Sequence, residues 1–418
     1  MEGQLLMECL KNFLSESYQR RLRLLAQSKS DRYEDTLKNY CDTFCAHFEL
    51  VMNNKCKNRD CIYYLSCNYV YSIIEKIKKD EIFDFFNRVR QIYLEWIDSE
   101  ITNALGQFDK LMSEFNLLHF EKEIKEYDLF FRGRVSEQVL TSWDMFHIPF
   151  NRRYLINNQR YSLTGQPMLY IGSSVLDIVE EIEAENLKNL KVSMVRLNAD
   201  SLKIYSLQSN ITDELVDLDV DLLFNDESDI YNKSNFFRML LASVCSFQRR
   251  QELKGFNFCE EYVLPQMLAQ ILKRKGFDGV AYYSTKRYEN LVYSEDGVKK
   301  DLAYFRDDNF EFKENIAIFT KINMEHVYDR QLYDKIQISV PVSQQRIERI
   351  TIEDIKELCE LIAASKKQKN ITAAEKIVSS FGRIYDKMYI DDQKYEQTEF
   401  GKLHCYLVFT VLSQILIS

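Results

Sequence analysis

One short span of the chain contains four side chains that could hold a charged, aromatic ligand. The stretch RYSLTGQPMLYIGSSVLDIVEE, residues 160–181, includes Arg160, Tyr170 and the pair Glu180 and Glu181. A guanidinium can bind an anion through two charge-assisted hydrogen bonds. An aromatic ring can lie against a flat cation, and a carboxylate stabilises nearby positive charge. The plainer interpretation is a turn arginine, a core tyrosine and two solvated glutamates, and this window alone favours it.

Local signals predict how the backbone would position these side chains. The glycine and proline of SLTGQP interrupt any regular element, so Arg160–Ser162 would end one element and Met168–Ile171 would begin a strand. A helix is predicted to follow, with Ser173 or Ser174 as its N-cap. Arg160 and Tyr170 would then meet across a hairpin-like turn, and one of the two glutamates would project from the helix.

Length, composition and charge limit the class of protein. The 418 residues are enough for two or three units with separate cores, and 46% hydrophobic residues exclude general disorder. The formal charge of -9 is spread along the chain without a basic block, so nucleic acid is not the expected partner. The start lacks a secretory pattern, and the apolar run from Leu403 to Ser418 is short for a membrane span. We expect a cytoplasmic protein that ends in a buried helix.

The composition and the spacing of apolar residues along the chain predict three parts. Residues 1–120 have apolar positions at helical spacing, with helices expected over about 3–27, 33–52, 63–77 and 81–118. Residues 121–343 contain all four prolines and the strand-like runs VSMVRL, LKIYSL, GVAYYS and NIAIFT, which indicate an α+β unit. Residues 344–418 return to helical spacing.

The cysteines and histidines do not follow metal-binding patterns. Five cysteines near the N-terminus raise the question of a zinc site, yet none of them belongs to a C-x-x-C pair. They are Cys41, Cys45, Cys56, Cys61 and Cys67. The five histidines are far apart in sequence. We therefore expect reduced, buried thiols and no metal.

Seven pieces of the middle part occur in the order seen in the RES family, which is named for an arginine, a glutamate and a serine. The pieces are FRGR from Phe131, DMFHIPFNRR from Asp144, QRYSLTGQPMLYIGSS from Gln159, LLASVCSF from Leu240, EEYVLPQMLAQIL from Glu260, GFDGVAYYSTKR from Gly276 and NIAIF from Asn315. The resemblance covers about Tyr127 to Val342, roughly half of the chain. It favours the functional interpretation over the plainer one.

The resemblance implies a fold, an activity and a set of site residues. RES proteins are similar in fold to ADP-ribosyltransferases, and many are toxins of toxin–antitoxin pairs that destroy NAD+. The expected architecture is thus an ADP-ribosyltransferase-like mixed sheet domain between helical regions. The carry-over gives the family arginine as Arg160, its tyrosine as Tyr170, its glutamate as Glu180 or Glu181, and its serine as Ser284. Arg132 matches an arginine near the start of the family pattern, and Ser246 is a second serine at a matching position.

The chemistry of NAD+ suits these residue types. Arg160, helped by Arg132, would hold the pyrophosphate, and Tyr170 would lie against the nicotinamide. One glutamate would stabilise the oxocarbenium-like ribose that forms as the N-glycosidic bond breaks. Ser284 would hydrogen-bond the ribose or the carboxamide, and no metal is needed. On this basis Arg160→Ala is expected to abolish NAD+ turnover and leave the fold intact.

Two features depart from the family pattern, and two further side chains are weaker candidates. Because Glu180 and Glu181 are adjacent, the family pattern does not identify which of the two carboxylates faces the ribose. Tyr283 precedes the serine, at a position where many relatives carry proline. Glu261 and Gln266 could reach the ligand from the scaffold helix predicted in EEYVLPQMLAQILKRKGFDG, although a structural role is favoured for both.

Other functions stay open at this point. The first interpretation is an NAD+ glycohydrolase or phosphorylase in a toxin–antitoxin or phage-defence setting. A mono-ADP-ribosyltransferase that modifies a protein is the second. The helical parts could instead form a nucleic-acid-binding, RNase or partner-binding module, but the R-x(4-6)-H signature of such an RNase is absent. The sequence does not identify an antitoxin, an oligomeric state or the fate of the ADP-ribose.

Overall fold

A computed structural model describes most of the chain. The described residues are 10–54, 70–125, 128–182, 189–199, 201–208, 226–250, 257–285, 314–343, 350–365, 367–385, 389–390 and 393–417. Residues 63–69 of the helix predicted over 63–77 lie outside these ranges, as do Cys56, Cys61 and Cys67, whereas residues 70–74 are described and helical.

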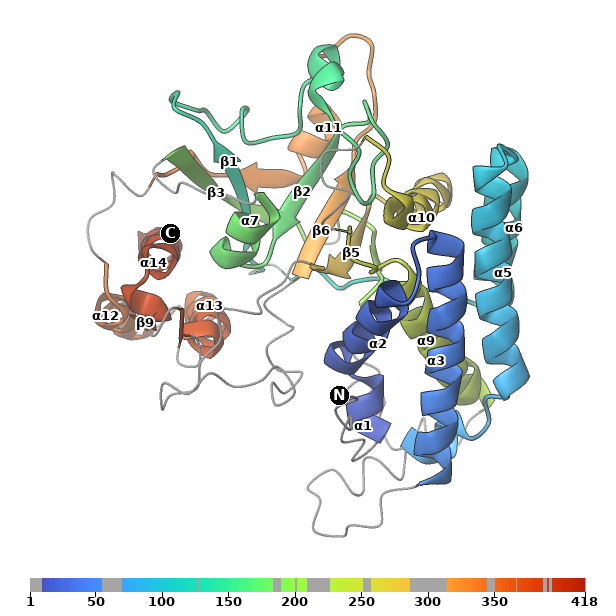
Figure 1. Cartoon of the computed structure of the whole chain (residues 1–418). Helices are drawn as coiled ribbons and strands as arrows, with labels where there is room; N and C mark the ends of the chain where they lie inside the picture. Colours follow the sequence, from blue (N-terminus) through green and yellow to red (C-terminus); the bar gives the residue numbers. More distant parts are fainter. Residues whose placement is uncertain are drawn as a thin grey trace. The chain divides into compact units, whose positions relative to one another are not determined.

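The chain forms two compact units, each built from segments that are separate in sequence (Figure 1). We call them the helical unit, with residues 1–121, 157–164 and 205–276, and the sheet unit, with residues 122–156, 165–204 and 277–418. The three parts expected from the sequence, 1–120, 121–343 and 344–418, follow chain order, and their boundaries stay predictions.

The helical unit contains the N-terminal helices and two later ones. They are α1 (Leu10–Leu14), α2 (Glu16–Ser28), α3 (Tyr33–Asn53), α5 (Lys79–Ile97), α6 (Ile101–Glu114), α9 (Asp226–Val244) and α10 (Val263–Arg274), with the 3₁₀ turn η5 (Glu260–Tyr262) before α10. The single helix predicted over 81–118 is two helices, because Ser99 adopts φ 68° and ends the first one. The predicted scaffold helix is α10, and it stops before Gly276, whose φ is 87°.

A sheet of seven described strands belongs to the sheet unit, except for residues 205 and 206 of its edge strand β4, which are assigned to the helical unit. The strands are β1 (Phe130–Val135), β2 (Met168–Gly172), β3 (Leu190–Leu197), β4 (Ile204–Ser206), β5 (Gly279–Tyr283), β6 (Glu314–Phe319) and β7 (Ile336–Ile338), in the spatial order β4-β5-β6-β2-β1-β3-β7. Each pairing with a described register is antiparallel. The predicted strand-like runs and the α+β class are thus confirmed.

Each face of this sheet has a hydrophobic core of its own, because successive side chains on a strand point to opposite faces. Phe130 packs with Leu169, Ile171 and Ile316 on one face. Phe131, one residue later, belongs to the cluster on the other face, which is covered by α7 (Val175–Ile182) and the C-terminal helices. We call this second face the α7 face.

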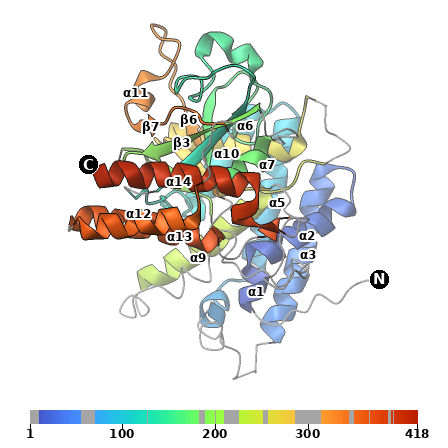
Figure 2. The ribbon, with the colours of Figure 1, turned by 90° about the vertical axis from the view of Figure 1, so that its left-hand side faces the viewer.

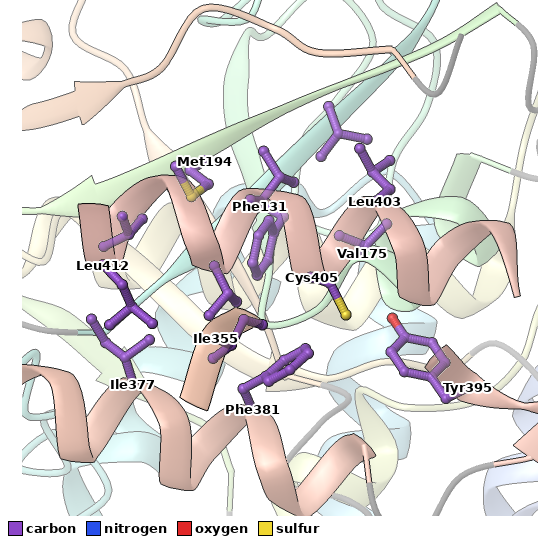
Figure 3. Packing of buried hydrophobic residues seen from close by; sticks show 14 of the residues in the cluster. Phe131, Val175, Met194, Ile355, Ile377, Phe381, Tyr395, Leu403, Cys405 and Leu412 are labelled. Atoms are coloured by element: carbon purple, nitrogen blue, oxygen red, sulfur yellow. The ribbon is translucent and has the colours of Figure 1, made fainter. Parts of the chain in front are cut away.

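The C-terminal part completes the α7 face. Its elements are α12 (Ile352–Ala364), α13 (Gln368–Tyr385), β8 (Tyr389–Ile390), β9 (Gln393–Lys394), η9 (Tyr395–Gln397) and α14 (Glu399–Ile417). The helix α14 lies beside α12 and α13 (Figure 2). Figure 3 shows how side chains of these helices meet Phe131, Val175 and Met194. The expected buried helix at the end of the sequence is therefore confirmed.

Two further short elements of the sheet unit are η1 (Phe150–Leu155) and α11 (Arg330–Tyr333).

Across the described part of the chain, none of the helices combines the length and the apolar character that a membrane crossing requires.

Candidate functional site

The segment that was expected to end a regular element at Arg160–Ser162 is neither helix nor strand, and this prediction is wrong. Residues 156–167 carry no strand, and β2 pairs with β1 and β6 instead of with a preceding hairpin partner. Gln266 of α10 holds the segment, because its Nε2 donates to the carbonyl oxygens of Gln159 (2.8 Å) and Ser162 (3.2 Å). The Gln266 side chain therefore satisfies backbone carbonyls that strand pairing would otherwise satisfy, and Gln266 has a structural role.

Arg160 is buried in the helical unit, where main-chain carbonyls occupy its guanidinium. Its NH1 donates to the Cys245 oxygen (2.9 Å) and its NH2 to the Phe247 oxygen (3.0 Å). The guanidinium carbon also lies 4.9 Å from the centre of the Tyr262 ring. The two carbonyls flank Ser246, so Arg160 fixes the backbone around a second candidate residue.

Glu261, the other weak candidate, also has contacts within the helical unit. It is buried, its carboxylate lies 3.8 Å from Arg250 Nε, and the Cys259 thiol donates to its Oε2 (3.1 Å). These contacts give the buried acid the partners that it needs. They favour the structural role that was preferred for it.

In the sheet unit, α7 carries one of the candidate glutamates over the sheet. The helix begins after Ser174, whose Oγ accepts the Asp177 N–H (3.1 Å), so the N-cap expected at Ser173 or Ser174 is Ser174. Two strand glycines let the helix approach closely. A Cβ atom on Gly133 would lie 2.3 Å from Ile178 Cγ2, and one on Gly172 would lie 3.0 Å from Ile178 Cδ1.

The carboxylate of Glu181 is held by two side chains from neighbouring strands. Its Oε1 accepts the Ser284 hydroxyl (2.7 Å) and the Asn315 amide Nδ2 (2.9 Å). Among the residues that the structure describes, Oε2 of Glu181 has no hydrogen-bond partner. Glu181 is half-buried, whereas Ser284 and Asn315 are buried. One oxygen is thus fixed, and the other can bind a ligand.

Strand register explains why these residues meet. Asn315 of β6 is the partner of Gly172 on β2 and of Tyr282 on β5, so the side chains at these positions share the α7 face. Ser284 is two residues beyond Tyr282 and lies on the same side. Glu181 reaches the pair from α7, which covers that face.

Arg132 and Tyr170 form a second pair in the sheet unit. Arg132 NH1 donates to the Tyr170 carbonyl oxygen (2.7 Å). The register between β1 and β2 consists of the single pair Phe131 and Gly172, and the two strands diverge beyond it (Figure 1). The Arg132 side chain therefore satisfies a β2 carbonyl that the short β1–β2 ladder leaves free.

Arg132 is a cation without an acidic counterpart in the described structure. Its Nε is shielded from solvent and has no hydrogen-bond partner there, and no carboxylate of these residues forms an ion pair with it. Burial, and then the neighbouring Arg134, lower the pKa of Arg132 to about 10, so it stays charged at neutral pH. A half-buried charge of this kind favours an anionic ligand.

The structure therefore divides the predicted site residues between the two units. Arg132, Tyr170, Glu181 and Ser284 belong to the sheet unit, and Tyr170 lies two residues from Gly172 on the same face. Arg160 and Ser246 belong to the helical unit. The α7 backbone is described at Glu180, but its side chain lies outside the described structure.

Asn315 was missed as a site residue, although the NIAIF motif contains it. The signal that could have found it is its position. Asn315 is a polar residue in β6, and the next five residues along the chain, Ile316–Thr320, are all buried. Such a residue needs a hydrogen-bond partner. Sequence alone could not identify that partner, because Glu181 is 134 residues away in the chain.

The cysteines that raised the zinc question are partly described. Cys41 and Cys45 are buried one turn apart on α3, and the hydrogen bond with Cys45 together with burial raises the pKa of the Cys41 thiol. Within the described ranges, no group of three or more His, Cys, Asp or Glu side chains could hold a metal ion.

Comparison with known proteins finds a distant similarity to a protein with a toxin name. The chain is similar to a protein of Bacillus subtilis (strain 168) named "Putative toxin YopC", with 27% identity over 281 residues. The match covers 64% of this chain and 59% of the length of that protein. No family model matches the chain. No solved structure matches it either.

Proposed function

We propose that this chain is a toxin-like enzyme that cleaves the nicotinamide N-glycosidic bond of NAD+, with its catalytic carboxylate on Glu181. The distant relative carries a toxin name, which supports the class of protein but not the reaction. The RES-like motifs, and the ADP-ribosyltransferase-like fold that this resemblance implies, are the basis for choosing NAD+ as the substrate.

The observation that carries the proposal is the state of the Glu181 carboxylate. Two donors fix Oε1, and Oε2 is left without a partner among the described residues. A solvated glutamate would not be held by two buried side chains from different strands. An oriented carboxylate is what an oxocarbenium-like transition state requires, because it stabilises the positive charge without reorganising.

The other sheet-unit candidates suit the remaining parts of NAD+. Arg132, whose side chain starts from the face opposite Phe131 and reaches the Tyr170 carbonyl between β1 and β2, offers an uncompensated positive charge for the pyrophosphate. Tyr170 is half-buried on the α7 face and offers a ring for the nicotinamide, a contact of roughly 1 kcal/mol while the pyridinium is cationic. As the bond breaks, its electron pair goes to the nicotinamide nitrogen, and Glu181 faces the cationic ribose until water or another nucleophile attacks.

The role of Arg160 as a pyrophosphate clamp remains a prediction. Its guanidinium already holds two carbonyls in the helical unit, so the expectation that Arg160→Ala leaves the fold intact conflicts with those contacts. In this proposal Arg132 is the first choice for the anion contact.

The test is NAD+ turnover by the purified chain, with chromatography of the products. Glu181→Gln keeps the shape of the side chain and removes the charge, so kcat should fall by about 100-fold or more. Glu180→Gln is the matched control on the same helix and should retain most of the activity. Absence of NAD+ loss with the wild-type chain, with and without phosphate and cell extract, would refute the proposal. Equal losses in both variants would refute the assignment to Glu181.

The products separate the alternatives. Free ADP-ribose indicates a glycohydrolase, ADP-ribose 1-phosphate indicates a phosphorylase, and labelled protein in the extract indicates a mono-ADP-ribosyltransferase. RNA loss without NAD+ loss after induction in cells would favour the RNase alternative.

A further inference from the structure

We infer that Asn315 is a positioning residue that, together with Gly172, aims the free oxygen of Glu181 at the substrate. The inference rests on the proposed function and adds a residue pair to it. Asn315 donates from Nδ2 to Glu181 Oε1 (2.9 Å), the same oxygen that accepts the Ser284 hydroxyl. Because only the amide nitrogen of an asparagine can donate to a carboxylate, this contact also fixes which way the amide points.

The two donors restrict the carboxylate in different directions. Ser284 follows β5, whereas Asn315 lies in β6, so the bonds reach Oε1 from two adjacent strands. A carboxylate held by one hydrogen bond can still rotate about its last torsion, which is broad for glutamate. The second donor removes most of that freedom. It therefore keeps Oε2 in one direction.

Gly172 provides the space for this arrangement. It lies opposite Asn315 in the β2–β6 register. A Cβ atom at residue 172 would lie 3.0 Å from Asn315 Oδ1 and 3.0 Å from Ile178 Cδ1, and 3.4 Å from the Asp177 Cβ. The amide of Asn315 is therefore close above the β2 backbone, with α7 packed against the same glycine. Any side chain at 172 would push the amide and the helix that carries Glu181.

An asparagine suits this position better than an acid of the same shape. Asn315 is only 3% exposed, so an aspartate there would place a second carboxylate against Glu181 with little solvent screening. Like charges at such a distance favour the protonated form of one of them. Asn315→Asp thus keeps the volume of the side chain and replaces the donor by a repulsive acceptor.

The experiment compares Asn315→Asp with Asn323→Asp in steady-state NAD+ turnover across pH. Asn323 lies in an exposed loop and uses its Oδ1 to accept the Glu325 N–H, a role that aspartate can keep, so this variant is the matched control. For Asn315→Asp we expect kcat at pH 7.5 to fall by about 10- to 100-fold, with KM within about threefold of wild type. The acidic limb of its pH–rate profile should move to higher pH. If Asn315 had only a structural role, its replacement by aspartate would not shift the acidic limb of the pH–rate profile.

A second readout does not depend on turnover. Thermal unfolding of Asn315→Ala, Glu181→Ala and the double variant tests the contact itself. Because the two side chains share one hydrogen bond, the melting temperature of the double variant should fall by less than the sum of the two single decreases.

The outcomes separate this inference from the proposed function. A wild-type kcat and pH profile in Asn315→Asp would overturn the positioning role, while NAD+ cleavage would stand. If the wild-type chain does not consume NAD+, the proposed function fails, and additive melting decreases would then overturn the Asn315–Glu181 contact as well. If the decreases in melting temperature are not additive, the Asn315–Glu181 contact stands.

Discussion

His404 predicts a specific loss of stability in acid. It lies on α14 and is 3% exposed, with its ring 5.0 Å from that of Phe131 and 4.8 Å from that of Phe381. Its Nδ1 is 3.1 Å from the Tyr395 hydroxyl, which a neutral imidazole satisfies. Burial lowers the pKa of His404 to about 3, so the imidazole stays neutral in the folded protein.

The sign and size of the effect follow from proton linkage. An unfolded chain binds a proton on this histidine below about pH 6.5, whereas the folded chain does not until about pH 3. The contribution is therefore complete above pH 6.5 and is lost as the pH falls toward 3. At pH 5 the loss is about 2 kcal/mol, a large fraction of a typical unfolding free energy of roughly 5–15 kcal/mol.

The assay is urea unfolding at pH 8 and pH 5, followed by tryptophan fluorescence. The chain has two tryptophans, and Trp143 belongs to the sheet unit, so a Trp96→Phe background reports on that unit. In this background His404→Phe should reduce the difference in unfolding free energy between the two pH values by about 2 kcal/mol. Tyr395→Phe is the control, because it removes the hydroxyl but leaves a buried histidine. An unchanged difference in His404→Phe would refute the reasoning.

Two further predictions concern the residues that support the two units. Arg160→Ala should destabilise the helical unit by about 3 kcal/mol in denaturant unfolding, because it leaves the Cys245 and Phe247 carbonyls without their donor. Stability within 0.5 kcal/mol of wild type, as a rough limit, would leave the NAD+ clamp as the remaining role for this arginine. Gly172→Ala should lower the unfolding free energy of the sheet unit by about 2 kcal/mol through the close contacts at Asn315 and Ile178. In Asn315→Ala the added cost of Gly172→Ala should be smaller, and an equal cost in both backgrounds would contradict the proposed contact.

Local sequence signals predicted most of the elements near the site. Apolar runs of strand length gave β2, β3, β5 and β6, and the serine before VLDIVEE gave the start of α7. These signals act within a few residues of one another, so they can be read without the fold. The error at Arg160–Ser162 arose where a distant side chain, Gln266, replaces local pairing.

The roles of individual candidates could not be read in this way. Sequence left Glu180 and Glu181 equivalent, and only the packing of α7 brings Glu181 to Ser284. Arg160 and Arg132 are both arginines in matching motifs. One of them binds carbonyls in the helical unit, and the other lies beside Tyr170 in the sheet unit.

The sequence by itself determined the α+β class, the order of the elements and the residue types available for chemistry, because periodicity, caps and turn residues act over short distances along the chain. The tertiary structure alone decided which of those residues meet. Glu181, Ser284 and Asn315 are more than 30 residues apart in every pairing, and strand register with helix packing brings them to one face of the sheet. Contacts of this kind depend on the whole core, and no local pattern encodes them.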